Sequence, residues 1–452
     1  MALSPATAVL LGRRLREEQA DRRLPSVVAA VVRDDQVVWS DAAGTLDGRR
    51  DGLAPTAATA YRLGSITKTF VAVEVMRLRD EGSLDLADTA ADHLPELASL
   101  DLGRVTVGQL LTHTSGLQSE TDGPWWERAP GDDWPALVEA APQLRFAPGT
   151  RYHYSNTGYA VLGEIVARRR GVAWTEAVEG GILRPLGLTM TTRPPADAAP
   201  GLAVHPFADL VHAEPEHDAG AMAPAGQLWA SITDLAGWAA FLAGATRDVL
   251  AADTLTEMLR PVALNDVPDV AWGSAHGLGW QVWNVDGRRY AGHGGSMPGF
   301  LATLRVDLET GDGAVLLTNA TSGLGTVNAD LLDLLHEHEP HLPAPWSVDT
   351  AHEAGLDLVG EWFWGTQAFT LRLDGTDGLR LGTPGEGRGA RFTRRGDAWI
   401  GLEGYYAGET LTVRRDADGV PVQLDLASFV FTRTPYDPAA ELPGGHDPAG
   451  WH

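Results

Sequence analysis

A serine and a lysine stand three positions apart near the start of the chain, at Ser65 and Lys68. Residues at i and i+3 lie on one face of a helix, so the amine can reach the hydroxyl oxygen. A serine hydroxyl is a weak nucleophile until a base takes its proton, and a Ser-x-x-Lys step supplies that base within one turn. The alternative, a helix start with an exposed lysine, is disfavoured because residues 70–78 are apolar enough for a buried helix. The pattern indicates acyl-transfer chemistry.

A tyrosine and an asparagine follow in the Tyr-x-Asn step at Tyr154 and Asn156. Residues two apart in an extended segment point to the same side. A phenol beside an ammonium group can ionise more easily and exchange protons with a nucleophile. The Asn156 amide can orient a substrate amide. The alternative interpretation is a tyrosine packed on a loop.

A third segment, residues 291–296, reads Ala-Gly-His-Gly-Gly-Ser at the edge of a predicted strand. The glycines Gly294 and Gly295 allow a ligand to approach the backbone closely, so both are expected to bind substrate. The backbone N–H groups of Ser65 and Ser296 are expected to form an oxyanion hole. The alternative is a glycine-rich turn before the strand predicted from residue 300.

The bulk composition excludes some functions. The 452 residues include 35 Lys and Arg against 60 Asp and Glu, a net charge of -25, which repels nucleic acid and anionic membranes. The chain has no cysteine, so disulfides and thiolate chemistry are excluded. Apolar runs fall short of the ~18 residues that span a bilayer. The charges near the amino terminus follow the apolar stretch instead of preceding it, which is wrong for a secretory leader. We therefore expect a cytoplasmic protein without nucleic-acid or membrane partners.

The order of predicted elements indicates two domains. Strands near both ends of residues 1–340, with helices between them, predict one α/β unit with an antiparallel sheet and a helical insertion. Residues 341–352 are expected to be a linker. Short strands separated by Asp374-Gly375 and Asp418-Gly419 predict a small all-β barrel over residues 353–437. The last residues, 438–452, are expected to be a flexible tail.

Three histidines near the linker, His336, His338 and His341, invite a metal interpretation. Pro340 breaks their regular spacing, and no partner carboxylate motif or H-E-x-x-H pattern accompanies them. We expect no metal site and no cofactor.

Together the motifs Ser65-x-x-Lys68, Tyr154-x-Asn156 and His293-Gly-Gly resemble the serine β-lactamase and penicillin-binding-protein family, in particular its class C-like branch. The resemblance covers residues 5 to 337. It implies that Ser65 is the acylated nucleophile, Lys68 its activating amine, Tyr154 a general base and acid, and Asn156 a ligand of the substrate amide. Supporting phrases lie at residues 110–117, 183–188 and 224–231.

His293 stands where most of these proteins carry Lys-Thr-Gly. A histidine is at most partly charged near neutral pH, so it anchors a carboxylate less well than lysine. β-Lactamase and D,D-carboxypeptidase activities are therefore less expected than the esterase, D-aminopeptidase or peptide-acyl-transferase activities of family members with a His-x-Gly motif.

The appended barrel resembles the lipocalin-like domain of some family members, among them the penicillin-binding-protein-type thioesterases. These enzymes release and cyclise peptides held as carrier-protein thioesters on nonribosomal peptide synthetases. The resemblance implies a peptidyl substrate, no cofactor, and substrate contacts for Trp229 and for Arg433, whose alternative is an exposed arginine at a strand end.

Two main hypotheses share this site. In the first, Ser65 takes a peptidyl group ending in a D-residue and the peptide's own amine attacks it, which gives a head-to-tail macrocycle. In the second, water attacks, as in a D-aminopeptidase, an esterase or another amide hydrolase. A binding protein that has lost catalysis is a third reading, and the five intact motif residues argue against it.

Overall fold

The computed structural model describes residues 3–343, 345–348, 355–375, 378–382 and 389–435. The chain divides into two compact units, Met1–Leu342 and Pro343–His452. Within the first unit, eight strands form one antiparallel sheet in the order β2-β1-β12-β11-β10-β9-β8-β7. Their bounds are β1 Ser26–Arg33, β2 Gln36–Gly44, β7 Ala263–Leu264, β8 Ser274–His276, β9 Gln281–Val285, β10 Arg288–Met297, β11 Phe300–Asp307 and β12 Gly313–Thr318.

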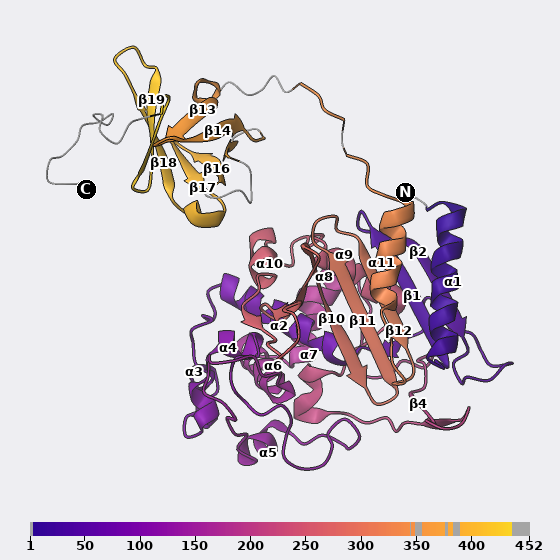
Figure 1. Cartoon of the computed structure of the whole chain (residues 1–452). Helices are drawn as coiled ribbons and strands as arrows, with labels where there is room; N and C mark the ends of the chain where they lie inside the picture. Colours follow the sequence, from indigo (N-terminus) through magenta and orange to yellow (C-terminus); the bar gives the residue numbers. More distant parts are fainter. Residues whose placement is uncertain (1–2, 344, 349–354, 376–377, 383–388, 436–452) are drawn as a thin grey trace. The chain divides into compact units, whose positions relative to one another are not determined.

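The sheet is covered on both faces, and strand β1, which lies between the edge strand β2 and β12, shows why. Every residue of β1 is buried, and successive side chains point to opposite faces of a strand. Val27, Ala29 and Val31 pack with helices α1 (Pro5–Asp21) and α11 (Val327–His338), which lie side by side in Figure 1. The alternate residues Val28, Ala30 and Val32 belong to the larger core on the other face.

The helical insertion supplies that larger core. Helix α2 (Thr67–Asp80) is buried along nearly its whole length and packs against α6 (Asn156–Arg170). Helix α9 (Ile232–Leu242) packs on the sheet. The remaining helices are α3 Ala90–His93, α4 Val107–Leu111, α5 Trp134–Glu139, α7 Trp174–Val178, α8 Arg184–Leu186 and α10 Ala252–Met258. Short 3-10 turns include η1 Gly64–Ile66 and η5 Gly220–Ala225.

Two small strand pairs complete the first unit. Strand β3 (Tyr61–Arg62) pairs with β6 (Trp229–Ala230), directly before the Ser65 turn. Strand β4 (Leu202–Val204) pairs with β5 (Val211–Ala213) in a hairpin. Among the helices that the structure describes, none is both long and apolar enough to cross a membrane.

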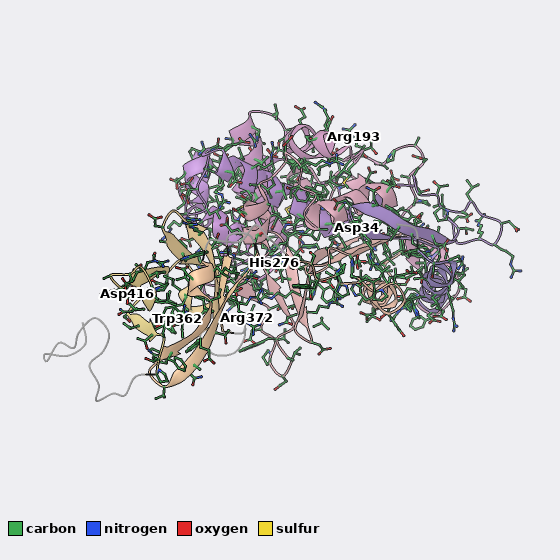
Figure 2. The ribbon with its side chains drawn as sticks, turned by 90° about the horizontal axis from the view of Figure 1, so that it is seen from above. Asp34, Arg193, His276, Trp362, Arg372 and Asp416 are labelled. Atoms are coloured by element: carbon green, nitrogen blue, oxygen red, sulfur yellow. The ribbon has the colours of Figure 1, made fainter. Side chains whose placement is uncertain are left out.

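The second unit is a closed antiparallel barrel, which confirms the predicted all-β domain. Its strands are β13 Gly360–Trp364, β14 Gln367–Leu373, β15 Gly378–Leu381, β16 Ala390–Arg395, β17 Ala398–Gly401, β18 Thr410–Arg415, β19 Pro421–Leu426 and β20 Phe429–Thr432. The first and last strands close it by pairing Phe363 with Thr432. Trp362, labelled in Figure 2, is fully buried in the barrel core. The tail predicted at 438–452 lies outside the described residues.

Candidate active site

The Ser65 turn places the expected nucleophile at the entry to the buried helix α2. Ser65 lies in η1 and remains partly accessible, whereas Lys68, in the first turn of α2, is fully buried. The Lys68 Nζ is 3.0 Å from the Ser65 Oγ and donates a hydrogen bond of 2.7 Å to the Ala225 carbonyl oxygen. The backbone carbonyl occupies one amine hydrogen, so the nitrogen is held facing the hydroxyl.

Burial sets the protonation state of Lys68. Loss of hydration disfavours the ammonium form and lowers the pKa of Lys68 to about 7, although the negative charges of Glu120 and Glu127 oppose the shift. A neutral amine has a lone pair that can accept the Ser65 proton. The amine therefore becomes available as a base near neutral pH instead of above pH ~10, where an exposed lysine titrates.

Tyr154 completes the immediate surroundings of the nucleophile. Its hydroxyl is hydrogen-bonded to Ser65, and its ring centroid lies 5.0 Å from the Lys68 Nζ. The expectation that the lysine eases ionisation of this phenol is wrong: burial raises the pKa of Tyr154 above its ordinary value, and the hydrogen bond between Tyr154 and Ser65 offsets only part of that effect. A phenol in this state stays protonated and can pass a proton on.

A histidine outside the predicted catalytic motifs packs against Tyr154. The His113 ring stacks on the Tyr154 ring with centroids 4.2 Å apart. Its Nδ1 accepts a hydrogen bond from the Ser155 N–H at 3.1 Å, and its carbonyl oxygen accepts one from the His153 N–H at 2.7 Å. His113 therefore fixes the loop that carries Tyr154. The only signal for it in the sequence was its place in the phrase at residues 110–117.

Asn156 begins α6 directly after the tyrosine loop. Ser155 caps this helix, and its hydroxyl accepts a hydrogen bond from the Gly158 N–H. The Asn156 Nδ2 donates to the Glu120 Oε1 at 2.6 Å, a partner that the sequence did not reveal. The Asn156 Oδ1 is buried and has no hydrogen-bond partner within the described part of the chain.

His293 lies on β10 and is buried beside His276, which is labelled in Figure 2. The His293 Nδ1 is 2.5 Å from the Gly294 carbonyl oxygen, so this nitrogen carries the proton and donates it. Loss of hydration lowers the pKa of His293 to about 3 and that of His276 to about 4. Both imidazoles are uncharged near neutral pH, so His293 provides no positive charge to hold a carboxylate.

Glycines bring β10 against the nucleophile turn. A Cβ atom on Gly64 would lie 2.5 Å from the Ser296 nitrogen, and one on Gly295 would lie 1.8 Å from the Leu63 carbonyl oxygen and 3.4 Å from the Ser65 nitrogen. Side chains at these two positions would keep the strand and the turn apart. The structure thus brings together Ser65 and Ser296, whose N–H groups are expected to form the oxyanion hole.

We predict that Gly295→Ala disables this contact. Its methyl group overlaps the Leu63 carbonyl oxygen, which should cost about 1–3 kcal/mol of folding free energy and lower kcat/KM about 100-fold by displacing an oxyanion donor. Gly294→Ala is the matched control for stability, because its Cβ would have no atom within 4 Å. Thermal melting of both variants, with ester-hydrolysis kinetics of the first, tests the prediction. Equal melting temperatures and full activity for Gly295→Ala would contradict it.

The two remaining predicted contact residues lie in different units. Trp229, on β6, is 3% exposed and packs edge-to-face on Phe300, with ring centroids 5.1 Å apart. Arg433 belongs to the barrel unit, where its guanidinium donates to the carbonyl oxygens of Asp357 and Val359 and lies 3.9 Å from the centroid of the Trp362 ring. Substrate contact by either residue stays a prediction.

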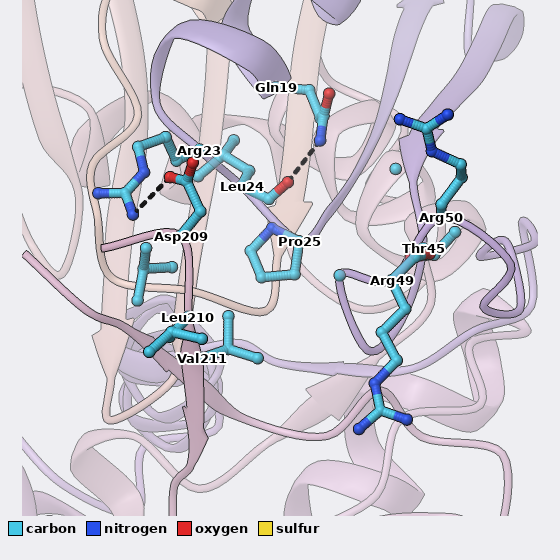
Figure 3. Close-up of a pocket in the computed structure, with 13 residues that line it drawn as sticks. Gln19, Arg23, Leu24, Pro25, Thr45, Arg49, Arg50, Asp209, Leu210 and Val211 are labelled. Carbon is cyan, nitrogen blue, oxygen red and sulfur yellow. Dashed lines mark hydrogen bonds and ion pairs between the residues drawn. The ribbon is translucent and has the colours of Figure 1, made fainter. Parts of the chain in front are cut away.

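A separate pocket lies between the end of α1 and the β4–β5 hairpin (Figure 3). No residue of the Ser65 site is among the described residues that line it. Arg23 is already paired there with Asp209 at 3.0 Å, and Gln19 donates to the Leu24 carbonyl oxygen at 2.7 Å. Elsewhere in the described chain, no three histidine or acidic side chains are grouped so as to hold a metal ion.

A partly accessible serine, a buried amine and a phenol hydrogen-bonded to that serine are the groups that chemistry through an acyl-serine intermediate requires. The sequence profile described as Beta-lactamase matches residues 11–337. The chain therefore belongs to the β-lactamase and penicillin-binding-protein family of serine hydrolases, as its motifs predicted. A profile for a domain of unknown function, DUF7586, matches residues 351–433 in the barrel unit.

Similar proteins include several kinds of family member. Penicillin-binding protein 4 of Amycolatopsis lactamdurans is 30% identical over 71% of this chain and 86% of its own length. The esterase EstB of Burkholderia gladioli is 35% identical over a segment that covers 37% of this chain and 47% of the esterase.

The solved structures similar to this chain include those of SurE and of a D-stereospecific amidohydrolase. SurE, also solved with D-Leu, is 26% identical with a TM-score of 0.60 and covers 95% of this chain and 99% of its own. A D-stereospecific amidohydrolase from Streptomyces sp. is 28% identical with a TM-score of 0.60 over 74% of this chain and 98% of its own.

Proposed function

We propose that this protein is a trans-acting penicillin-binding-protein-type thioesterase. In this proposal Ser65 accepts a peptidyl group ending in a D-residue from a carrier-protein thioester, and the peptide's own amine then releases it as a head-to-tail macrocycle. The observation that carries the acyl-transfer part is the contact of the Ser65 Oγ with the Lys68 Nζ, 3.0 Å away, and with the Tyr154 hydroxyl.

The uncharged His293 favours a thioester over a β-lactam or a D-Ala-D-Ala-like peptide. Substrates of the latter two kinds carry a carboxylate next to the bond that is broken, and a cation is the natural partner of that group. Burial keeps His293 neutral by lowering its pKa to about 3. A thioester of a carrier protein has no carboxylate at this place, so a neutral residue suits it.

The similarities support a peptide that ends in a D-residue. SurE, whose likeness extends over 95% of this chain and thus includes the barrel unit, was solved with D-Leu. The amidohydrolase that is 28% identical is D-stereospecific. The sequence itself resembles the cyclising thioesterases in its His-Gly-Gly motif and appended barrel.

The residues of the site suggest how the acyl group is taken up. Lys68, as a neutral amine, accepts the Ser65 proton while the Oγ attacks the thioester carbon. The negative charge that develops on the carbonyl oxygen is held by the N–H groups of Ser65 and Ser296. The proton then passes through Tyr154 to the leaving thiolate, and the C–S bond breaks. The peptidyl group is left on Ser65 as an ester.

Hydrolysis of a D-peptide, an amide or an ester is the second function to consider. The esterase and the amidohydrolase among the similar proteins, 35% and 28% identical, favour it. The same acyl-serine forms in both cases, and the difference lies in whether an amine or water attacks it. A pocket that excludes water would favour the amine.

A product analysis separates the two functions. The full chain is incubated with linear peptidyl thioesters that end in a D- or an L-residue, and the products are identified by mass spectrometry against synthetic standards. We expect cyclic peptide from the D-terminated thioester and little product from its L-epimer. Linear acid as the only product across varied sequences would reject cyclisation and leave the hydrolase function.

A further inference from the structure

A loop that follows the predicted motifs brings a carboxylate to the catalytic asparagine. Glu120 is exposed to solvent, and each of its oxygens accepts one hydrogen bond. Oε1 accepts from the Asn156 Nδ2 and Oε2 accepts from the Trp126 Nε1, both at 2.6 Å. The loop is further tied to the site by the Asn156 N–H, which donates to the Ser119 carbonyl oxygen at 2.8 Å. Glu120 is therefore held beside Asn156 and stays reachable from solvent.

A second carboxylate, that of Glu127, lies on the same loop. It is partly buried, and its Oε2 accepts a hydrogen bond of 2.9 Å from the Trp125 Nε1. Glu120 and Glu127 are close enough to Lys68 and Tyr154 that both raise the pKa values of these two groups. Two negative charges thus act electrostatically on the reacting groups.

In the part of the chain that the structure describes, no lysine, arginine or histidine forms an ion pair with Glu120 or Glu127. The buried Lys68 and Arg62 act on Glu127 electrostatically, but the Lys68 Nζ donates to the Ala225 carbonyl oxygen at 2.7 Å and the Arg62 Nη2 to the Gln227 Oε1 at 2.6 Å. Two neighbouring carboxylates without an ion-pair partner attract positive charge. This arrangement near the reacting groups favours binding of a cationic ligand.

Asn156 gives an independent indication of the same ligand. Its side-chain Oδ1 is buried without a hydrogen-bond donor in the described chain, and the residue is only 8% exposed. Because the Nδ2 is fixed on Glu120, the amide cannot turn over without losing that bond. The Oδ1 is thus an unsatisfied hydrogen-bond acceptor, which a donor from a ligand would satisfy. Two carboxylates and an amide oxygen are all acceptors, and a primary ammonium group offers three donors and one positive charge.

We propose that Glu120, Glu127 and the Oδ1 of Asn156 form a binding site for the primary ammonium group of the substrate. The inference rests on the proposed function and deepens it: the bound group is the amino end of the peptidyl chain, held beside the acyl-serine that it attacks. The substrate class is then a peptide with a free amino terminus, and an N-acylated peptide is excluded.

The protons of this step balance within the site. The ammonium group gives one proton to the Glu127 carboxylate, and the resulting amine forms a bond to the acyl carbon. A second N–H proton passes to Tyr154, which gives its own hydroxyl proton to the Ser65 Oγ as the bond between that oxygen and the acyl carbon breaks. An amide and a free serine result, and Glu127 returns its proton to solvent.

Binding to a variant that cannot react tests the site without relying on turnover. The full chain with Ser65→Ala is titrated calorimetrically with D-leucine amide and with N-acetyl-D-leucine amide at about pH 6.5, where an α-amine is protonated. The acetylated probe lacks the positive charge and carries an added acetyl group. We expect the amine to bind at least about 10-fold more tightly than its acetylated form.

Substitutions of single carboxylates identify the residues that cause the preference for the amine over its acetylated form. In the Ser65→Ala background, Glu120→Gln and Glu127→Gln keep the shape of each side chain and remove its charge, and each should reduce the preference to less than about 3-fold. Asp122→Asn is the matched control: Asp122 lies on the same loop and faces Arg145 at 3.9 Å, so the preference should persist. Melting temperatures show that each variant is folded.

Two results would overturn the inference: equal binding of the two probes to the Ser65→Ala protein, or a preference that survives in both glutamine variants. Failure of the proposed function is seen elsewhere, as linear acid alone in the product analysis. That result would leave an ammonium preference standing, as the amino-terminal specificity of a hydrolase.

Discussion

Replacing Ser65 with alanine is expected to lower kcat/KM for an activated ester or thioester by about 10⁴-fold or more, the size of effect seen when a serine nucleophile is removed. The reason is that the Oγ, 3.0 Å from the Lys68 Nζ, is the atom that forms the bond to the acyl group in the proposed function. The rate is measured by thiol or alcohol release, and intact-protein mass spectrometry checks that no acyl adduct forms.

Ser296→Ala is the control for this substitution. The Ser296 residue is exposed. Its backbone N–H, which alanine retains, is the group expected to serve as an oxyanion donor. This variant should lose less than about 10-fold in kcat/KM, because the oxyanion donor persists. Turnover that survives Ser65→Ala at the wild-type rate would remove the acyl-serine from the mechanism.

Replacing Lys68 with methionine is expected to slow acylation of Ser65 by about 10³-fold, within the range for loss of a general base. Methionine keeps an unbranched side chain in a fully buried position and removes the nitrogen that takes the serine proton. The Ala225 carbonyl oxygen loses the hydrogen bond of 2.7 Å, which costs about 1–3 kcal/mol of stability. Single-turnover acylation, followed by stopped flow, measures the effect at a temperature well below the melting point.

Comparing the acylation rate with the thermal melting of the Lys68→Met protein distinguishes a catalytic base from a structural residue. A folded Lys68→Met protein that acylates as fast as wild type would exclude the amine as the base. Loss of acylation together with loss of cooperative melting would show instead that the amine holds the fold. We expect slow acylation with cooperative unfolding retained.

The candidate catalytic residues could be located in the sequence because their spacing is local. Ser65 and Lys68 share one helical turn, and the loop of Tyr154 leads directly into α6. The barrel strands were equally readable, since Asp374-Gly375 and Asp418-Gly419 mark turns between short apolar runs. Such signals depend on neighbours in the chain, which a sequence displays.

Strand β10 shows where local signals fail. Residues 291–296 are rich in glycine, which disfavours a strand, and the segment was also open to interpretation as a turn. The structure pairs it with β11 from Tyr290 opposite Asp307 to Met297 opposite Phe300. Its glycines are required by the close approach of the Ser65 turn, a tertiary contact that residue propensities do not contain.

Contacts between site residues and side chains from distant segments could not be predicted from the sequence either. His113 beneath Tyr154, and Glu120 on Asn156, are joined to these residues across about 40 positions of the chain. The direction of the Tyr154 pKa was wrongly predicted for the same reason. Proximity to an amine argued for easier ionisation, whereas burial, which only the fold determines, has the larger effect and raises the pKa.

The pH dependence of covalent labelling tests the role of Lys68 most directly. The full chain is treated with a fluorophosphonate under single-turnover conditions, and the modified peptide is identified by mass spectrometry. We predict one adduct, on Ser65, formed at a rate that falls as the pH drops below about 7, because only the neutral Lys68 amine accepts the proton and its pKa is lowered to about 7. The rate should level off above that pH, since Tyr154 stays protonated. An adduct on another residue, or a labelling rate that keeps rising toward the pKa of an exposed lysine near ~10, would contradict the account.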